Sequence, residues 1–297
     1  MSFAGRWSVI MTIAALIDGG GSKTRVRLIH FETGSIIGET VSGPGNLGLG
    51  AGAVYASINN ACNILQCSRP DRIIAGLAGT EYAFERDQFL TLSSCPTQLI
   101  SDRDSGLLGA HGGCVGGCLT VGTGVVLSWL DHDGKINRRG GFGFVLGDQG
   151  GGAWIGLRVL QQLLKLADRS AWQASHYAVV EEMKIGSARE DFIVFAHTAS
   201  PADFALLAQI VCGQSILGNQ FARDLLDEGV SYLVEILDEL PQGLPIALVG
   251  GLATVYTPKL HQLGFNVTEP KGNALDGLAL IGSYRVQASV DIWTNYE

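Results

Sequence analysis

The sequence predicts an α/β fold made of two similar lobes, and three observations carry that prediction. A buried-strand pattern runs into a glycine tip and returns as a strand twice, around residues 13–31 and 118–130. After each of these hairpins, strand patterns alternate with helical ones. The length of 297 residues and the 46% share of hydrophobic residues suffice for two buried cores. A cleft between the two lobes is the expected place for a ligand.

The first predicted lobe begins with a hairpin. The apolar run 13–17 reads as a buried strand, residues 18–24 form its glycine tip, and 25–31 alternates like a strand. A third strand is expected over 35–41, ending at the turn Gly43-Pro-Gly-Asn46. The pattern then predicts helix 51–66, strand 73–79, helix 81–92, strand 97–100 and helix 104–111. Strand 97–100 delivers Ser101 and Asp102 to its carboxyl end.

The second predicted lobe repeats this beginning. Strand 118–121 leads into the tip 122–124, and residues 125–130 return as a strand. The expected elements that follow are a short strand from 136, a glycine-rich loop over 140–152, helix 153–167, several further helices with the longest over 219–240, strand 246–251 and closing helix 274–286. We therefore predict lobes over 12–117 and 118–273, with a closing helix over 274–290 that packs back on the first.

Charge and composition exclude several classes of protein. The net charge is −8, the pI is near 5.2, and no basic run exceeds two residues, which argues against a nucleic-acid or anionic-membrane partner. No apolar run reaches 18 residues, and the apolar stretch near the N-terminus leads directly into the Asp18 strand. We expect a cytoplasmic protein without a signal peptide, in which residues 1–10 are a dispensable extension and Met11 an alternative start.

The six cysteines show no disulfide or zinc framework. Cys114 and Cys118 form the nearest pair, but nothing beside them supplies the second pair that a zinc site requires. Two reduced cysteines in a glycine-rich segment are the simpler interpretation.

The first glycine tip, Asp18-Gly-Gly-Gly-Ser-Lys-Thr24, indicates a site for a metal and a phosphate. Glycines let backbone N–H groups approach an anion closely, and the residues after them supply hydroxyl and ammonium donors. Asp18 would repel a phosphate unless a divalent cation lay between them, and Mg²⁺ favours that arrangement. The tip lacks the glycine before Lys of a P-loop and the third glycine of a dinucleotide fingerprint. A glycine hairpin without a ligand stays open as the alternative.

Two further glycine clusters complete a predicted ATP site. Residues 122–124 would form the phosphate clamp of the second lobe, and the late pair Gly250-Gly251 would let an adenosine lie flat on the backbone. Each cluster alone is weak, but their order and spacing together are specific. The predicted ATP and phosphate ligands are Gly20, Gly21, Ser22, Lys23, Thr24, Gly122, Thr123, Gly124, Gly250 and Gly251.

In these motifs the chain resembles the superfamily of sugar kinases, actin and Hsp70 ATPases. Within it, the sequence is similar to the N-acetylglucosamine and glucosamine kinases of the BadF/BadG-type family. The resemblance spans about residues 13–285 and rests on motifs in family order: 18–24, 43–46, 75–79, 101–102, 122–124, 140–143 with 146–152, and 248–251. It implies two ribonuclease H-like, actin-like lobes, ATP and Mg²⁺ as cofactors, and an amino sugar as the partner. A homodimer is compatible with it.

The resemblance also implies site residues, and chemistry supports part of them. Asp102, at a strand end, would take the proton from the sugar 6-hydroxyl as that oxygen attacks the γ-phosphate. Asp104 is its rival, although a residue within the following helix is expected to point elsewhere or to cap the turn. Asn46, Gly141 and Asp148 would bind the sugar, and Asp18 would hold Mg²⁺ through water. An Asx turn for Asn46 and a helix N-cap for Asp148 remain the alternatives.

The stretch 148–162 looks most like bacterial glucosamine kinases, so glucosamine is expected first and N-acetylglucosamine second. Two departures from the acetylglucosamine kinases, Gln149 for Glu and Phe142 for Trp, favour this order without settling it. Loss of a carboxylate at Gln149 is not what a cationic sugar would favour. The alternatives are an iron–sulfur ATPase that activates a dehydratase, and a nucleotide-binding regulator without catalysis.

Overall fold

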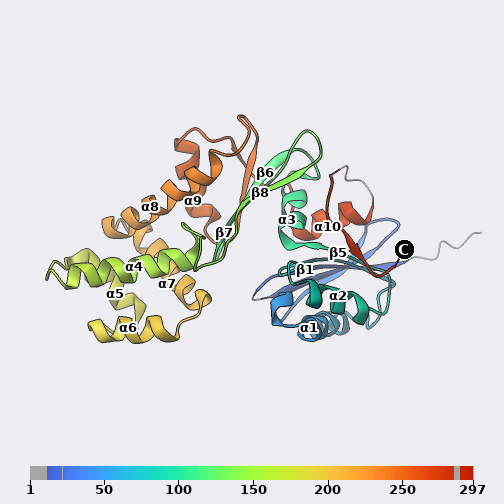
Figure 1. Ribbon diagram of the computed structural model, residues 1–297, viewed down its shortest axis with the longest axis horizontal. Coiled ribbons are helices and arrows are strands. Elements are labelled where there is room, and N and C mark those ends of the chain that lie inside the picture. The colour runs from blue at the N-terminus through green and yellow to red at the C-terminus, as the bar shows by residue number, and fades with distance from the viewer. Residues whose placement is uncertain (1–11, 22, 284–287, 297) are drawn as a thin grey trace, which may run out of the picture. The chain divides into compact units, whose positions relative to one another are not determined.

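The computed structural model describes residues 12–21, 23–283 and 288–296, and the chain divides into two compact units (Figure 1). The first unit comprises the chain up to Cys114, the segment Leu130–Ile136 and the C-terminal part from Lys271. The second comprises Val115–Trp129 and Asn137–Pro270. The division therefore falls three residues before the expected boundary at 117, and the chain returns to the first unit twice.

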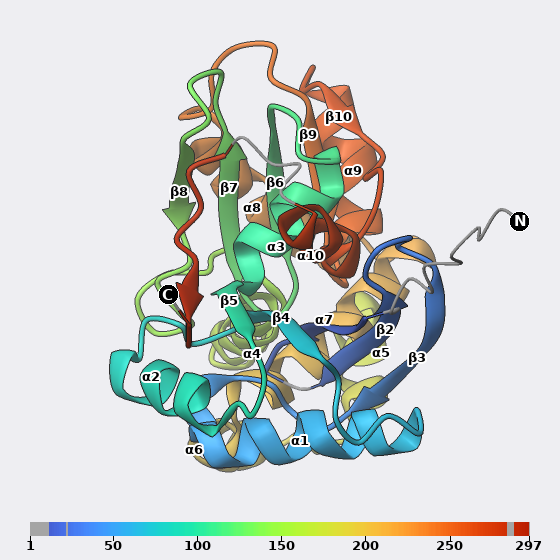
Figure 2. The same ribbon diagram turned by 90° about the vertical axis from the view of Figure 1, so that its right-hand side faces the viewer.

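The first unit is built on a mixed sheet of order β11-β5-β4-β1-β2-β3 (Figure 2). Its strands are β1 (Ile13–Gly19), β2 (Thr24–His30), β3 (Ile36–Ser42), β4 (Arg72–Leu77), β5 (Thr97–Ser101) and β11 (Trp293–Thr294). Strands β1, β2 and β3 pair antiparallel, whereas β1, β4 and β5 run parallel. The carboxyl ends of β1, β4 and β5 therefore meet at one edge of the sheet, where ligands bind in open α/β sheets.

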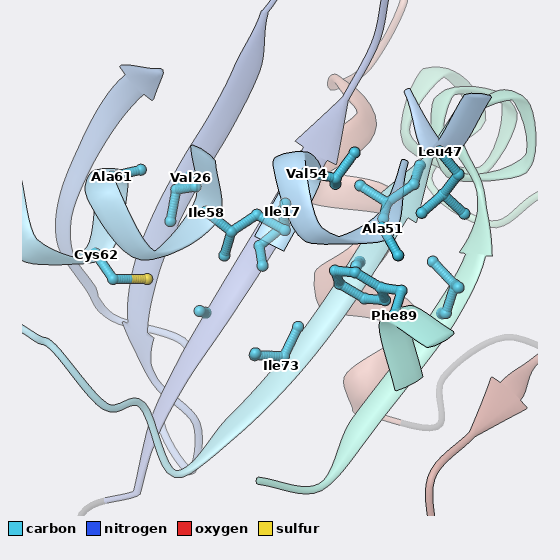
Figure 3. Close-up of a cluster of buried hydrophobic side chains, with 14 of the residues drawn as sticks. Ile17, Val26, Leu47, Ala51, Val54, Ile58, Ala61, Cys62, Ile73 and Phe89 are labelled. Carbon is cyan, nitrogen blue, oxygen red and sulfur yellow. The ribbon is translucent and has the colours of Figure 1, made fainter. Parts of the chain in front are cut away.

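Two pairs of helices cover the two faces of this sheet. Helices α1 (Ala51–Ile64) and α2 (Ala83–Leu92) enclose a core that includes Ile17, Ile58 and Phe89 (Figure 3). Helices α3 (Asp102–His111) and α10 (Ala274–Gly282) pack on each other and on the opposite face. Alternation along the strands supplies both cores, because successive side chains point to opposite faces.

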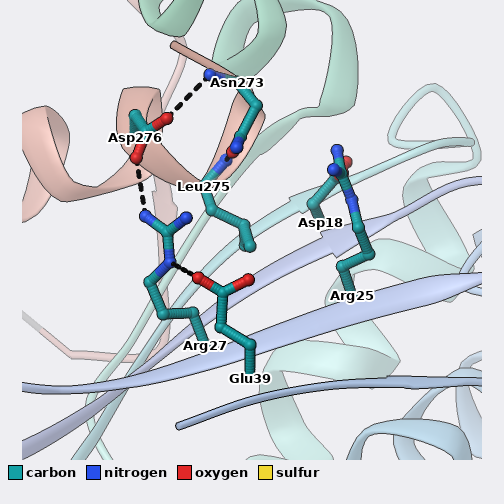
Figure 4. Close-up of polar contacts among 7 residues, drawn as sticks. All are labelled: Asp18, Arg25, Arg27, Glu39, Asn273, Leu275 and Asp276. Carbon is teal, nitrogen blue, oxygen red and sulfur yellow. Dashed lines mark hydrogen bonds and ion pairs between the residues drawn. The ribbon is translucent and has the colours of Figure 1, made fainter. Parts of the chain in front are cut away.

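Helix α10 is fastened to the sheet by Arg27, which is only 8% exposed (Figure 4). Arg27 Nε donates to Glu39 Oε1 at 2.5 Å, and Nη1 donates to Asp276 Oδ1 at 2.6 Å. The other carboxylate oxygen of Asp276 accepts the Asn273 N–H at 2.8 Å, which closes a capping box at the helix start. Burial acts in the opposite direction, but these hydrogen bonds lower the pKa of Asp276. The packing of this helix on the first unit thus has a specific ionic basis. Of its expected last residues, 284–287 lie outside the described part, and 288–290 are not helical.

The second unit is built on a sheet of order β10-β9-β6-β7-β8. Its strands are β6 (Gly116–Val121), β7 (Val125–Leu130), β8 (Ile136–Gly140), β9 (Ile246–Val249) and β10 (Val267–Thr268). Helices α8 (Gln220–Leu237) and α9 (Ala253–Gln262) share a core with this sheet, to which Leu119, Leu233 and Tyr256 contribute. Helices α4 (Gly152–Ala167), α5 (Ala174–Met183), α6 (Arg189–Thr198) and α7 (Pro201–Ile216) form a second core with α8.

Within the described residues, no single helix is long and apolar enough to cross a membrane. Helices α7 and α8 meet the length and composition criteria only when they are taken together as a pair bent by 117°.

Candidate active site

Backbone hydrogen bonds join three turns at the carboxyl edge of the first sheet. Gly20 O accepts the Gly45 N–H at 2.9 Å, and Gly19 O accepts the Ala78 N–H at 2.8 Å. A side chain at Gly19 or Gly45 would not fit, because a Cβ on Gly45 would come within 2.5 Å of the Gly19 Cα. The glycine tip, the 43–46 turn and the turn after β4 therefore form one rigid edge, as ligand sites on sheet edges require.

Asp18 is paired with Arg25, its direct neighbour across the β1–β2 ladder. Arg25 donates to Asp18 Oδ2 through Nε at 2.9 Å and through Nη2 at 2.6 Å. The Asp18 side chain is 17% exposed and that of Arg25 38%. The negative charge at the mouth of the tip is thus already balanced by a cation, which the sequence analysis did not anticipate.

Asp102 is the first residue of α3, directly after β5. Ser101 caps the helix by accepting the Arg103 N–H at 3.2 Å, so Asp102 occupies the first turn, where the helix dipole favours a carboxylate. Burial raises the pKa of the Asp102 carboxyl from 3.8 to about 6. The charge and backbone N–H of Arg103 oppose this rise, whereas repulsion from Asp18 and Glu81 adds to it. A carboxylate with this pKa is ionised at neutral pH and is a stronger base than an ordinary aspartate.

Asp104, the rival candidate for the base, is 1% exposed. Its neighbour Ser105 is fully buried as well, and the Ser105 hydroxyl donates to the Asp102 carbonyl at 2.8 Å. The Asp104 side chain is buried and already has an interaction within the protein. A substrate hydroxyl has no access to such a carboxylate, so the geometry favours Asp102.

Asn46 lies beside the turn that follows β4. Its Oδ1 accepts the Gly48 N–H at 2.8 Å and caps the short 3₁₀ helix η1 (Leu47–Leu49), which is the Asx-turn arrangement that the sequence left open. Its backbone forms an isolated bridge to Ala78, and Gly79, at a φ of +81°, packs against Oδ1. Within the described ranges, the amide NH₂ group of Asn46 makes no hydrogen bond, so its two donors are available to a ligand.

Two charged residues that sequence reasoning missed adjoin Asp102. The predicted helix 81–92 begins only at Ala83, so Glu81 lies in the turn before it. Arg103 Nη2 lies 3.8 Å from Glu81 Oε2, and Arg103 Nε donates to the Ser101 hydroxyl at 3.3 Å. The signal for Glu81 was available: a carboxylate two residues after a glycine-ended strand.

The predicted phosphate donors of the first tip have different environments. Gly21 and Lys23 are exposed, and Gly20 N–H closes the tip on Lys23 O at 3.0 Å. Thr24 is fully buried, and its hydroxyl has no hydrogen-bond partner among the described residues. A phosphate cannot reach that hydroxyl in this conformation, in contrast to the expectation that Thr24 is a phosphate donor. Ser22 lies outside the described residues.

In the second unit, the tip Gly122–Gly124 meets a helix start and the late glycine pair. Gly122 O accepts the Gly152 N–H at 2.8 Å and Thr123 O accepts the Ala153 N–H at 2.9 Å, which fixes the start of α4 on the tip. Gly250, at a φ of +104°, packs directly on the carbonyl of Val121, and only glycine fits there. Thr123, Gly250 and Gly251 are exposed. The unit thus brings both predicted glycine clusters to one place.

Asp148 braces the loop 140–152 against that tip. It adopts a left-handed φ of +62°, and its carboxylate lies where a Cβ on Gly124 would be. Burial raises the pKa of Asp148, against the backbone N–H groups of Val125 and Gly143 that lower it. Its Oδ1 is buried and has no hydrogen-bond partner among the described residues. The alternative interpretation of Asp148 as a helix N-cap is wrong, because Gly151 occupies the N-cap of α4. Gly141 is exposed on the same loop, and its N–H donates to Val125 O at 2.9 Å.

The residues fit a magnesium ion that binds mainly to nucleotide. No group of three or more His, Cys, Asp or Glu side chains in the described ranges could hold a metal by itself. Both hydrogen bonds from Arg25 end on Oδ2 of Asp18, which leaves Oδ1 to accept from metal-bound water. Mg²⁺ commonly binds in this way, through one or two carboxylates, several waters and substrate phosphates.

The sequence profile of the BadF/BadG/BcrA/BcrD ATPase family matches residues 17–262. The chain belongs to this family. The profile contains every predicted site residue, from Asp18 to Gly251, and the resemblance drawn from the motifs is confirmed.

Named relatives are similar over most of their length. A glucosamine kinase, GspK, from Vibrio cholerae serotype O1 is 28% identical over 279 residues, which cover 88% of this chain and 92% of the relative. An N-acetyl-D-glucosamine kinase from Dictyostelium discoideum is 24% identical over 81% of this chain and 83% of the relative. A crystal structure from Chromobacterium violaceum, provisionally described as an N-acetylglucosamine kinase, is 26% identical with a TM-score of 0.81 over 92% of this chain and 99% of that one. The predicted α/β fold of two actin-like lobes is confirmed.

Proposed function

We propose that this protein is an ATP-dependent kinase that phosphorylates the 6-hydroxyl of an amino sugar, with glucosamine the first candidate and N-acetylglucosamine the second. The named relatives act on these two sugars by their descriptions, and they are similar over more than four fifths of this chain. Identities of 24% and 28% support the reaction class more strongly than the individual sugar.

The observation that carries the proposal is the environment of Asp102. This carboxylate stands at the carboxyl end of β5, is only partly buried, and has a pKa of about 6. A kinase that uses a hydroxyl as nucleophile needs such a base, because the proton must leave the oxygen as the new P–O bond forms. Asp102 would accept the proton from O6, and the O6–phosphorus bond would form as the bond from the γ-phosphorus to the β–γ bridging oxygen breaks.

The remaining residues would bind and orient the reactants. Asn46 would hold sugar hydroxyls through its amide N–H groups, and Asp148 and Gly141 are the other proposed sugar ligands. Exposed backbone N–H groups at the two glycine tips, with Lys23 and the Thr123 hydroxyl, would take the phosphates. Asp18 would orient the water shell of Mg²⁺, which supplies charge neutralisation at the β- and γ-phosphates when bound. Exclusion of water from the acceptor position would suppress ATP hydrolysis.

A coupled assay of ADP release tests this proposal. Purified protein with MgATP is offered glucosamine, N-acetylglucosamine, N-acetylmannosamine or glucose, and the product is located by phosphorus NMR. We expect stimulation by the amino sugars above that by glucose, with the phosphate on O6. If no sugar stimulates ADP release, or if the phosphate is found on another oxygen, the proposal is wrong.

An iron–sulfur ATPase would require reactive cysteine thiolates. Burial raises the pKa of Cys118 to about 12, and that side chain is 2% exposed, which argues against cluster binding at this position. Iron analysis of protein purified without oxygen would test this alternative, and we expect no stoichiometric iron.

A further inference from the structure

Glu81 lies on the same sheet edge as Asp102, the proposed base, and Asn46, a proposed sugar-binding residue. It follows β4 by four residues, in a turn closed by the Tyr82 N–H, which donates to Gly79 O at 3.0 Å. The same turn packs against Asn46 through Gly79. Strand β5, which delivers Asp102, is the direct neighbour of β4, with Ser101 opposite Leu77. Asn46, Glu81 and Asp102 therefore come from three adjoining segments of one rigid edge.

Of the two ion-paired carboxylates at this edge, Asp18 and Glu81, Glu81 has the weaker existing interaction. Asp18 holds Arg25 at 2.6 Å, with 17% of the Asp18 side chain exposed. Glu81, in contrast, is 60% exposed and lies 3.8 Å from Arg103, too far for a strong hydrogen bond. A carboxylate in this state can accept an incoming cation with little loss of existing interactions.

Arg103 links Glu81 to the helix that carries the base. It lies between the Ser101 hydroxyl at 3.3 Å and the Glu81 carboxylate at 3.8 Å. The Glu81 charge also reaches Asp102, where it adds to the rise of the pKa. The distance to Arg103 and the effect on the pKa of Asp102 thus both place Glu81 near the proposed base.

We propose that the Glu81 carboxylate recognises the ammonium group of glucosamine and makes the site prefer this sugar over its N-acetylated form. The inference rests on the proposed function. In a glucosamine ring, the amine on C2 and the hydroxyl on C6 lie on opposite sides, so one sugar can face Asp102 with O6 and a neighbouring strand end with its amine. An acetamide carries no positive charge and gains nothing from Glu81. This carboxylate would supply the negative charge that Gln149 does not.

The test compares two sugars in matched variants. Glu81→Gln keeps the shape and removes the charge, and Glu81→Asp keeps the charge on a shorter side chain. The control is Asp87→Asn, which removes a largely exposed charge from helix α2 of the same segment. For each protein, kcat/KM is measured with glucosamine and with N-acetylglucosamine at fixed MgATP, together with its pH profile.

We expect Glu81→Gln to lower kcat/KM for glucosamine by about 10- to 100-fold, the usual range for a charge-assisted hydrogen bond to a ligand, and that for N-acetylglucosamine by less than about threefold. Glu81→Asp should recover part of the loss, and Asp87→Asn should change neither value. The effect of Glu81 on Asp102 acts on both sugars equally, so it cancels in their ratio.

Three results would overturn the inference: equal losses for the two sugars, no loss for either, or a parent protein that uses N-acetylglucosamine but not glucosamine. Failure of the proposed function has a different signature, because the parent protein would then release no ADP with any amino sugar.

Discussion

The two glycine tips occupy equivalent places in their sheets but have different surroundings. Around the first, charged side chains dominate: Asp18 pairs with Arg25, and Glu81 with Arg103, beside Asp102. Around the second, backbone groups dominate, and Asp148 is the acidic side chain that packs on the tip. The same strand–tip–strand motif is thus surrounded by ionisable side chains in the first unit and by backbone groups in the second. Four substitutions probe the two units, with expected effects in decreasing order.

Removing the base should cause the largest effect. We expect Asp102→Asn to lower kcat by about 10³-fold, the middle of the range for a general base, while sugar binding persists. Full activity in this variant would mean that Asp104 is the base or that no base is needed. Asp104→Asn is a weak control, because a substitution of this buried side chain can disturb the fold. Sugar binding to Asp102→Asn should therefore be measured by isothermal calorimetry together with the rates.

The same substitution should stabilise the protein. Since the folded pKa of Asp102, about 6, exceeds its unfolded value of 3.8, the folded state binds the proton more tightly. Stability from this group is therefore greatest at low pH and is lost as the pH rises from about 4 to 6. Asp102→Asn removes the penalty, which is on the order of 1–3 kcal/mol above pH 7 and absent below pH 4. Urea denaturation at pH 8 and pH 4 measures it.

In the second unit, a substitution at the glycine tip should mainly lower the stability of the fold. Gly124→Ala would drive a methyl group into the Asp148 carboxylate, so we expect a loss of about 2–4 kcal/mol in the free energy of unfolding. Gly122→Ala is the matched control, because a Cβ at Gly122 meets no atom within 4 Å. Equal urea midpoints for the two variants would show that the contact between Asp148 and the tip is not rigid.

A smaller loss is expected at the ionic tie of the first unit. Asp276→Asn removes the charge that holds Arg27 and should cost about 1–3 kcal/mol, because the buried guanidinium keeps only Glu39. Burial raises the pKa of Asp276, but the hydrogen bonds from Arg27 and Asn273 and the nearby arginine charges together outweigh burial, so this pKa is lowered in the folded state. The contribution of Asp276 to stability is therefore present at neutral pH and is lost as the pH falls below 4. A difference between parent and variant that stays undiminished as the pH falls from 7 to 3 would contradict this origin.

The smallest expected effect is a displacement of a pH profile. The acid limb of kcat/KM should lie near pH 6, the pKa of Asp102, and activity should rise as the pH increases through it. Glu81→Gln removes a neighbouring negative charge and should move this limb to lower pH by less than one unit for either sugar. A limb near pH 4 in the parent protein would show that the base is not Asp102.

Local patterns in the sequence were sufficient for the strands and their glycine ends. The predicted strands around Ile17, Leu119 and Leu248 agree with β1, β6 and β9, because apolar runs bounded by glycines have few other solutions. Ends were less accurate: the helix expected from Glu81 starts at Ala83, so Glu81 lies in the turn before the helix.

Interactions between distant segments escaped prediction. Nothing in a strand pattern shows that Arg25 neutralises Asp18 or that Arg27 meets a helix far along the chain, since register and tertiary packing decide both. The two-residue strand β11 was missed for the same reason, as it is defined only by pairing with β5. The buried Thr24 hydroxyl shows the opposite error, in which a suitable residue type faces inward.

The bond between Arg27 and Asp276 joins residues 249 positions apart, and it bears on the order of events during synthesis. When the ribosome has completed the first 114 residues, helix α10 has not yet been made, and the sheet face that it covers is open to water. The second unit, in contrast, ends at Pro270 and can complete its core earlier. The first unit, whose synthesis begins first, is therefore expected to complete its folding last. A nascent chain would expose Leu16 and Ile74 until its final segment emerges.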